Sequence, residues 1–167
     1  MEHGREQDYL VYPIIYLYQH HIELSLKNII RRAPDVIDRT LTESETKNLN
    51  HSHKPDVLWQ DLKPMFAAMW DEAGWDRVSA ADEVGVESYI RQLTALDADS
   101  FSFRYAGSRK GGFHYLTELR NINPRHFTEM VEQLADYLDA LGAAVGVLYD
   151  GKMEMEAEYI CELRNER

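Results

Sequence analysis

The sequence predicts an all-α fold: an up-and-down bundle of four to five helices with a short extended or hairpin insertion around residues 100–120. Several long stretches carry apolar residues at helical spacing, and prolines and glycines stand between these stretches or near their ends. Only the region around residues 100–120 contains short segments of a different, extended character. The chain of 167 residues has no internal repeat, so we expect a single domain over residues 1–167.

The first helix is expected over about residues 12–32. Its apolar residues recur at intervals of three and four, and Pro34 is expected to close it, because the residue before a proline is pushed out of the α region. The polar residues His20, Glu23 and Lys27 are spaced three and four apart and therefore share one face of this helix. We expect function to be found first on that face.

The next stretches are a connection and two helices. Residues 34–50 are polar and predict a surface connection with at most a short helical turn. Residues 55–73 carry a wide apolar stripe that predicts a second helix, kinked or split at Pro64. A third helix is expected over residues 79–98, where a serine and an acidic residue three positions later form a capping pattern.

The second half begins with the extended region. Residues 100–105 alternate between apolar and polar side chains, and residues 113–119 can pair back on them across a glycine-rich turn. A proline after an asparagine then predicts the start of a long fourth helix over residues 124–148. Gly151 is expected to break this helix, with a last amphipathic helix after it.

Composition and charge limit the classes of function. The chain is 44 % hydrophobic, with a formal net charge of −11 and one cysteine, Cys161. No apolar run approaches the roughly 18 residues that span a bilayer, and the polar N-terminus lacks the core of a signal peptide. These features predict a cytoplasmic protein without a membrane partner. Because nucleic-acid surfaces need positive charge, RNA or a nucleotide would have to bind at a local basic patch.

The motif His20-x-x-Glu23 with Lys27 after it, followed by His53 on the way into the second helix, resembles the HEPN-like family of prokaryotic helical-bundle proteins. So does the segment 99–105 before a later helix. The resemblance covers most of the chain and implies an all-α bundle, usually a homodimer, of the kind found in toxin–antitoxin and phage-defence systems. Some members are metal-independent ribonucleases, and others are binding or dimerisation modules.

Ribonuclease members of this family have an arginine, often followed by a polar residue, and a histidine four to six positions after the arginine. Arg120, Asn121 and His126 fit this pattern, and the resemblance implies that they are catalytic. His126 would act as general base or acid, Arg120 would stabilise charge on the phosphate, and Asn121 would orient either. No metal or cofactor is expected. Arg109 and His114 have the same spacing, but they lie in a glycine-rich loop.

Two positions depart from the family pattern. Gln19 stands where relatives of this subgroup often have arginine. Pro124 falls between Arg120 and His126, which argues against one helical surface carrying both residues.

A second candidate set combines polar residues of the first helix with two more distant ones: His20, Glu23, Lys27, His53 and Arg104. The set has three interpretations: a buried polar network that joins the first helix to the second, a site for a nucleotide or partner, or, with His21 and His51, a metal site. If Arg104 faces inward it needs a carboxylate, and Glu23 is the candidate. Alternatively, Arg104 forms the local phosphate-binding patch together with Arg109 and Lys110.

The sequence thus supports hypotheses of different classes. The first is a ribonuclease effector that uses Arg120, Asn121 and His126. The second is a non-catalytic module that binds a nucleotide or a partner protein, such as an antitoxin, through the second set. A metal-dependent hydrolase is the third. We expect a homodimer that forms through an apolar helical face.

Overall fold

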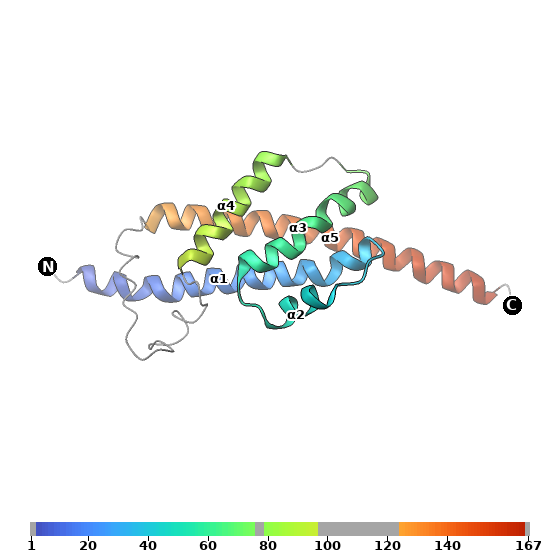
Figure 1. Cartoon of the computed structure of the whole chain (residues 1–167), viewed down its shortest axis with the longest axis horizontal. Coiled ribbons are helices and arrows are strands. Elements are labelled where there is room, and N and C mark those ends of the chain that lie inside the picture. Colours follow the sequence, from blue (N-terminus) through green and yellow to red (C-terminus); the bar gives the residue numbers. More distant parts are fainter. Residues whose placement is uncertain (1–2, 76–78, 97–123, 166–167) are drawn as a thin grey trace.

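The computed structural model describes residues 3–75, 79–96 and 124–165, and these form five helices (Figure 1). The helices are α1 (His3–Val36), α2 (Glu43–His51), α3 (Pro55–Ala73), α4 (Ala80–Leu96) and α5 (Pro124–Asn165). Within these ranges no strand occurs, which confirms the all-α bundle. The predicted insertion around residues 100–120 lies outside the described residues.

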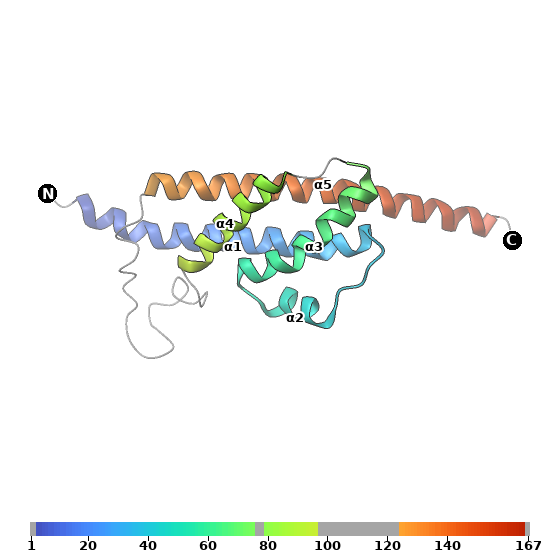
Figure 2. The same cartoon turned by 45° about the horizontal axis from the view of Figure 1, so that its top comes forward.

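The two longest helices, α1 and α5, lie side by side and run in the same direction (Figures 1 and 2). Helix α3 packs against α1, and α4 packs against both α3 and α5. The short α2 packs on α3. Because α1 and α5 are offset, the N-terminal end of α1 extends from one end of the bundle and the C-terminal end of α5 from the other.

The core lies along α1, which packs against both α3 and α5. Each helix contributes apolar residues at intervals of three or four, which places them on one face. The fully buried side chains include Ile22, Leu26 and Ile29 of α1, Trp59, Leu62 and Met69 of α3, Ile90 and Leu93 of α4, and Val131, Leu138 and Val145 of α5. Burial of each large apolar side chain contributes roughly 1.5–3 kcal/mol. The side chain of Gln19 adds a polar link, because its Nε2 donates to the carbonyl of Leu93 over 3.1 Å.

The first helix does not end at Pro34, as the sequence suggested. Pro34 is buried within α1, which continues to Val36. The end comes at Asp38, whose φ of 50° is left-handed. The amide of Arg39 then donates back to the carbonyl of Pro34 over 2.9 Å, the hydrogen bond of a Schellman-type helix end. A proline one turn from the end removes only one helical hydrogen bond, and packing against the core compensates for it.

The predicted break at Gly151 is also wrong. Helix α5 is continuous over 42 residues, and the expected last helix is its C-terminal part. A glycine inside a helix costs only about 1 kcal/mol, and the residues after Gly151 are strong helix formers. Lys152 anchors this region, because its Nζ lies 3.2 Å from the carbonyl oxygen of Val36 and 2.7 Å from the carboxylate of Asp38.

Two further regions, the stretch before α3 and α3 itself, also differ from the prediction. The polar stretch before α3 holds the full helix α2, which Thr42 and Glu45 begin with a capping box. Helix α3 runs through Pro64 as one helix and ends at Gly74, whose φ is 64°.

Candidate functional site

The polar face of α1 carries a buried ion pair. Lys27 Nζ donates to Glu23 Oε1 over 2.8 Å, and the exposed fractions of the two residues are only 6 % and 4 %. His53, which precedes α3, places Nδ1 3.0 Å from the same oxygen of Glu23. Glu23 therefore links α1 to the start of α3. Of the second candidate set, the structure brings together Glu23, Lys27 and His53, which we call the Glu23 cluster.

The cluster keeps Glu23 ionised. Burial by itself raises the pKa of this carboxyl. The hydrogen bonds and electrostatic interactions that Glu23 makes with Lys27 and His53 outweigh burial and leave its pKa below the ordinary value of 4.5. Since Glu23 and Lys27 are enclosed, only His53, whose side chain is 48 % exposed, offers this cluster to a ligand.

His20 lies beside this cluster on α1 and is half-buried. Its ring stacks on Tyr16, with the centroids 5.9 Å apart and the planes 4° from parallel. Its buried Nδ1 has no hydrogen-bond partner among the residues that the structure describes. The neighbouring His21 points elsewhere, with Nε2 3.6 Å from a carboxylate oxygen of Asp139 on α5.

The residues implied as catalytic are only partly described. Arg120 and Asn121 lie outside the described residues, as does Arg104 of the second candidate set. His126 lies in the first turn of α5 and is exposed. The geometry therefore places one member of the predicted ribonuclease set at the accessible start of a long helix. Across residues 3–75, 79–96 and 124–165, no group of three or more His, Cys, Asp or Glu side chains could hold a metal ion.

Another candidate site lies at the opposite end of α5. Residues 153–165, which we call the α5 extension, follow the point where Lys152 binds the end of α1. They continue α5 for about 20 Å at 1.5 Å per residue, and their C-terminal part projects beyond α1 (Figures 1 and 2). Large apolar side chains on this extension are 45–65 % exposed: Met155, Tyr159, Ile160 and Leu163. The sequence indicated an amphipathic helix here, but the predicted break at Gly151 concealed its continuity with α5.

Comparison of the chain with protein-family models, with curated proteins and with solved structures gives no match. None of the described helices has the combination of length and apolar sequence that crossing a bilayer requires. The site must therefore be interpreted from its own chemistry.

Proposed function

We propose that the chain is a HEPN-like, non-catalytic dimerisation module, and that the α5 extension is the surface on which a second copy docks. The observation that carries this proposal is the apolar stripe of the extension, because it continues the stripe that α5 buries in its own bundle. The acidic charge of the chain agrees with a protein-binding role better than with a phosphate-binding one.

The stripe along α5 and its extension follows a heptad pattern. Along α5, residues recur at alternating intervals of four and three that define one seam: Leu134, Leu138, Leu141, Val145, Leu148, Lys152, Met155 and Tyr159. The residues of the seam up to Val145 are buried, whereas Met155 and Tyr159 are 65 % and 62 % exposed. Such a seam is typical of helices that pair with another helix. Beyond Lys152, α1 no longer covers it.

A second copy fits the extension by symmetry. If two extensions pair antiparallel about Tyr159, Met155 faces Leu163 of the other copy, since both lie four residues from the centre. Glu154 then faces Arg164 of the other copy, since both lie five residues from the centre. Met155 and Leu163 therefore form an apolar contact in this arrangement and Glu154 and Arg164 an opposite-charge pair, whereas Glu156 faces Glu162.

The molar mass of the full chain in solution tests the proposal. We expect twice the chain mass of 19.5 kDa by light scattering, and the monomer mass for Met155→Asp. Val147→Asp is the matched control, because Val147 is equally exposed on α5, at 66 %, but lies off the seam. A monomeric wild type, or a dimer that Val147→Asp disrupts as strongly, contradicts the proposal.

A ribonuclease function is the second candidate, favoured by the exposed position of His126 at the start of α5. Cleavage of a mixed RNA pool in the presence of EDTA tests it. Loss of cleavage in His126→Ala but not in His51→Ala, which removes an exposed histidine from α2, would support this function. An RNA pool left intact by the wild type would exclude it.

A further inference from the structure

The pair of long helices α1 and α5 buries its core side chains on one face only. On the opposite face, large apolar side chains of both helices remain exposed within the described part of the chain: Leu17 and Leu24 of α1 at 62 % and 48 %, and Val147 of α5 at 66 %. Leu24 stands two residues from the buried Leu26, and Val147 two residues from the buried Val145, which is about 200° around a helix. We call this surface the outer face; it consists of these three exposed side chains and their exposed neighbours Asn28, Asp136, Asp139, Ala143 and Asp150.

A groove of about 330 Å³ lies between α1 and α5 on the outer face. Ser25 and Asn28 of α1 line one wall, and Gly142 and Ala143 of α5 line the other. Asn28 and Ala143 are exposed, so a partner can reach both walls. Gly142 has no side chain and Ala143 has a single methyl group, which lets another helix approach closely, because the contacting side chains set the distance between packed helices. The groove therefore suits a helix.

The α5 edge of the outer face is acidic. Asp136 and Asp150 stand seven residues before and after Ala143, so all three lie on one face of α5. Both carboxylates are exposed, and neither has an ion pair within residues 3–75, 79–96 and 124–165. Asp139 lies between them, with one oxygen 3.6 Å from Nε2 of His21. This edge therefore attracts positive charge.

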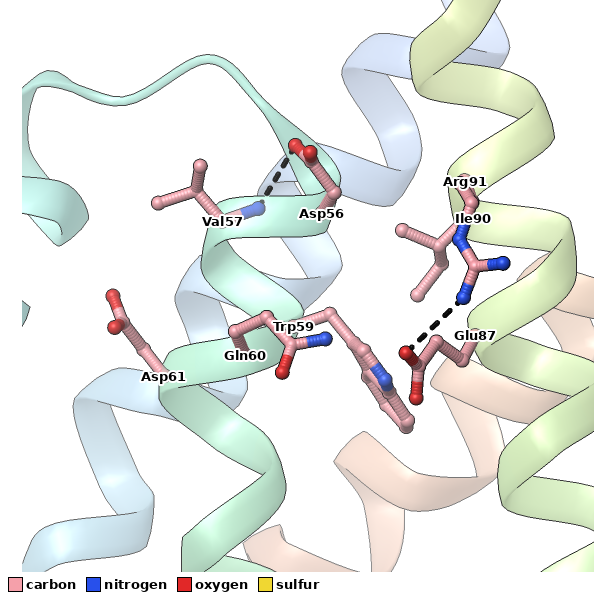
Figure 3. Close-up of a pocket in the computed structure, with 8 residues that line it drawn as sticks. All are labelled: Asp56, Val57, Trp59, Gln60, Asp61, Glu87, Ile90 and Arg91. Carbon is pink, nitrogen blue, oxygen red and sulfur yellow. Dashed lines mark hydrogen bonds and ion pairs between the residues drawn. The ribbon is translucent and has the colours of Figure 1, made fainter.

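The side of the bundle formed by α3 and α4 differs in both respects. Its carboxylate Glu87 lies 2.9 Å from Lys63 Nζ and 3.3 Å from Arg91 Nη2, and Figure 3 shows the second of these ion pairs. The cavity beside this carboxylate is lined by Trp59 and Ile90, which are only 0 % and 1 % exposed. A partner cannot reach these two apolar side chains, whereas it can reach those of the outer face.

An apolar groove with carboxylates along one edge fits an amphipathic helix that has a basic flank. In this mode of recognition the apolar stripe of the helix provides affinity, and complementary charge fixes its orientation. The basic flank would lie along α5, because the α1 edge carries the exposed Arg31. A second copy of the chain matches less well, since its own outer face brings the same three carboxylates to the contact.

We propose that the outer face binds an amphipathic helix of another protein. The apolar stripe of that helix packs on Leu24, Ala143 and Val147, and its lysines or arginines lie beside the carboxylates of α5. This surface does not depend on the proposed dimer, since none of its residues belongs to the α5 extension.

A synthetic peptide tests the chemistry of the partner. The probe is a labelled, capped peptide of about 18 residues, made of leucine and lysine, whose leucines share one helical face. Fluorescence anisotropy with the intact chain should show saturable binding, and Met155→Asp, which removes the proposed dimer contact, should bind equally well. A peptide of the same composition in shuffled order should bind at least about tenfold more weakly, because it has charge without an apolar face.

Two matched pairs of variants locate the binding surface. Val147→Asn should weaken the peptide about fivefold, because an apolar contact is lost, whereas Val84→Asn, at a valine of α4 that is 67 % exposed, should change the affinity less than about twofold. Asp136→Asn with Asp150→Asn should also weaken it about fivefold. Glu43→Gln with Glu72→Gln, which removes the same charge from exposed positions on α2 and α3, should change it less than about twofold.

All of these substitutions are at exposed positions, so each variant should fold. No binding at about 100 μM protein, equal binding of the shuffled peptide, or equal weakening by the members of either matched pair would overturn the proposal. A Met155→Asp chain that stays dimeric and becomes monomeric with Val147→Asn would overturn it as well, because a second copy would then occupy the outer face.

Discussion

Lys27 and Glu23 form an ion pair of 2.8 Å one helical turn apart on α1, and both side chains are almost completely enclosed by the bundle. The pair is joined by His53 from the segment before α3. A buried charge is tolerated only with partners, so each member of this cluster depends on the others.

Removal of one member should therefore destabilise the fold. We expect Lys27→Met to lower the free energy of unfolding by about 3 kcal/mol, because Glu23 loses its closest cation while it remains buried. Urea denaturation followed by circular dichroism measures this change. Lys47→Met, which alters an exposed lysine on α2, should change the free energy of unfolding by less than about 0.5 kcal/mol. Equal effects of the two substitutions would show that the buried pair contributes no special stability.

Acid should weaken the fold through the same carboxylate. The pKa of Glu23 is lowered in the folded chain, since its partners outweigh burial, and the pKa of Glu45 is lowered in the same way by Thr42 and Arg39. Below pH 4.5 the unfolded chain therefore binds more protons than the folded one. The stabilisation is complete above pH 4.5 and is lost as the pH falls through the folded pKa values.

The slope of unfolding free energy against pH measures this linkage. In the range below pH 4.5, the slope should be smaller for Glu23→Gln than for the wild type. An unchanged slope would mean that Glu23 titrates alike in both states.

The continuity of α5 predicts the effect of a substitution at Gly151. A β-carbon at this position would meet no atom within 4 Å, so Gly151→Ala should raise the free energy of unfolding by about 0.5–1 kcal/mol. Gly74→Ala should have the opposite effect, because Gly74 has a left-handed φ of 64°. Thermal unfolding of both variants tests the contrast. Destabilisation by Gly151→Ala would indicate that the helix bends or ends there.

The sequence predicted the fold more fully than the site. Apolar spacing located the main helices because their buried faces repeat every three to four residues, and the spacing of Glu23 and Lys27 placed them on one face. Pro34 and Gly151 misled the prediction, since each affects one hydrogen bond or one backbone position while tertiary packing stabilises the whole helix.

The unpaired N–H of Trp59 left no trace in the sequence. Trp59 stands on an ordinary apolar stripe, and only the packing of the helices shows that its buried Nε1 has no hydrogen-bond partner among the described residues. The exposed stripe of the α5 extension was visible as a pattern, but its exposure depends on where α1 ends, and that was predicted several residues too early.

Disulfide trapping across the proposed dimer axis tests the central claim most directly. Cys161 is the only cysteine in the sequence, so Cys161→Ser gives a background without thiols. In that background, Tyr159→Cys should form a covalent dimer on mild oxidation, because antiparallel pairing brings the two copies of residue 159 together, whereas Val147→Cys should remain monomeric on a denaturing gel. A monomer from Tyr159→Cys, or equal trapping at both positions, would contradict docking through the α5 extension.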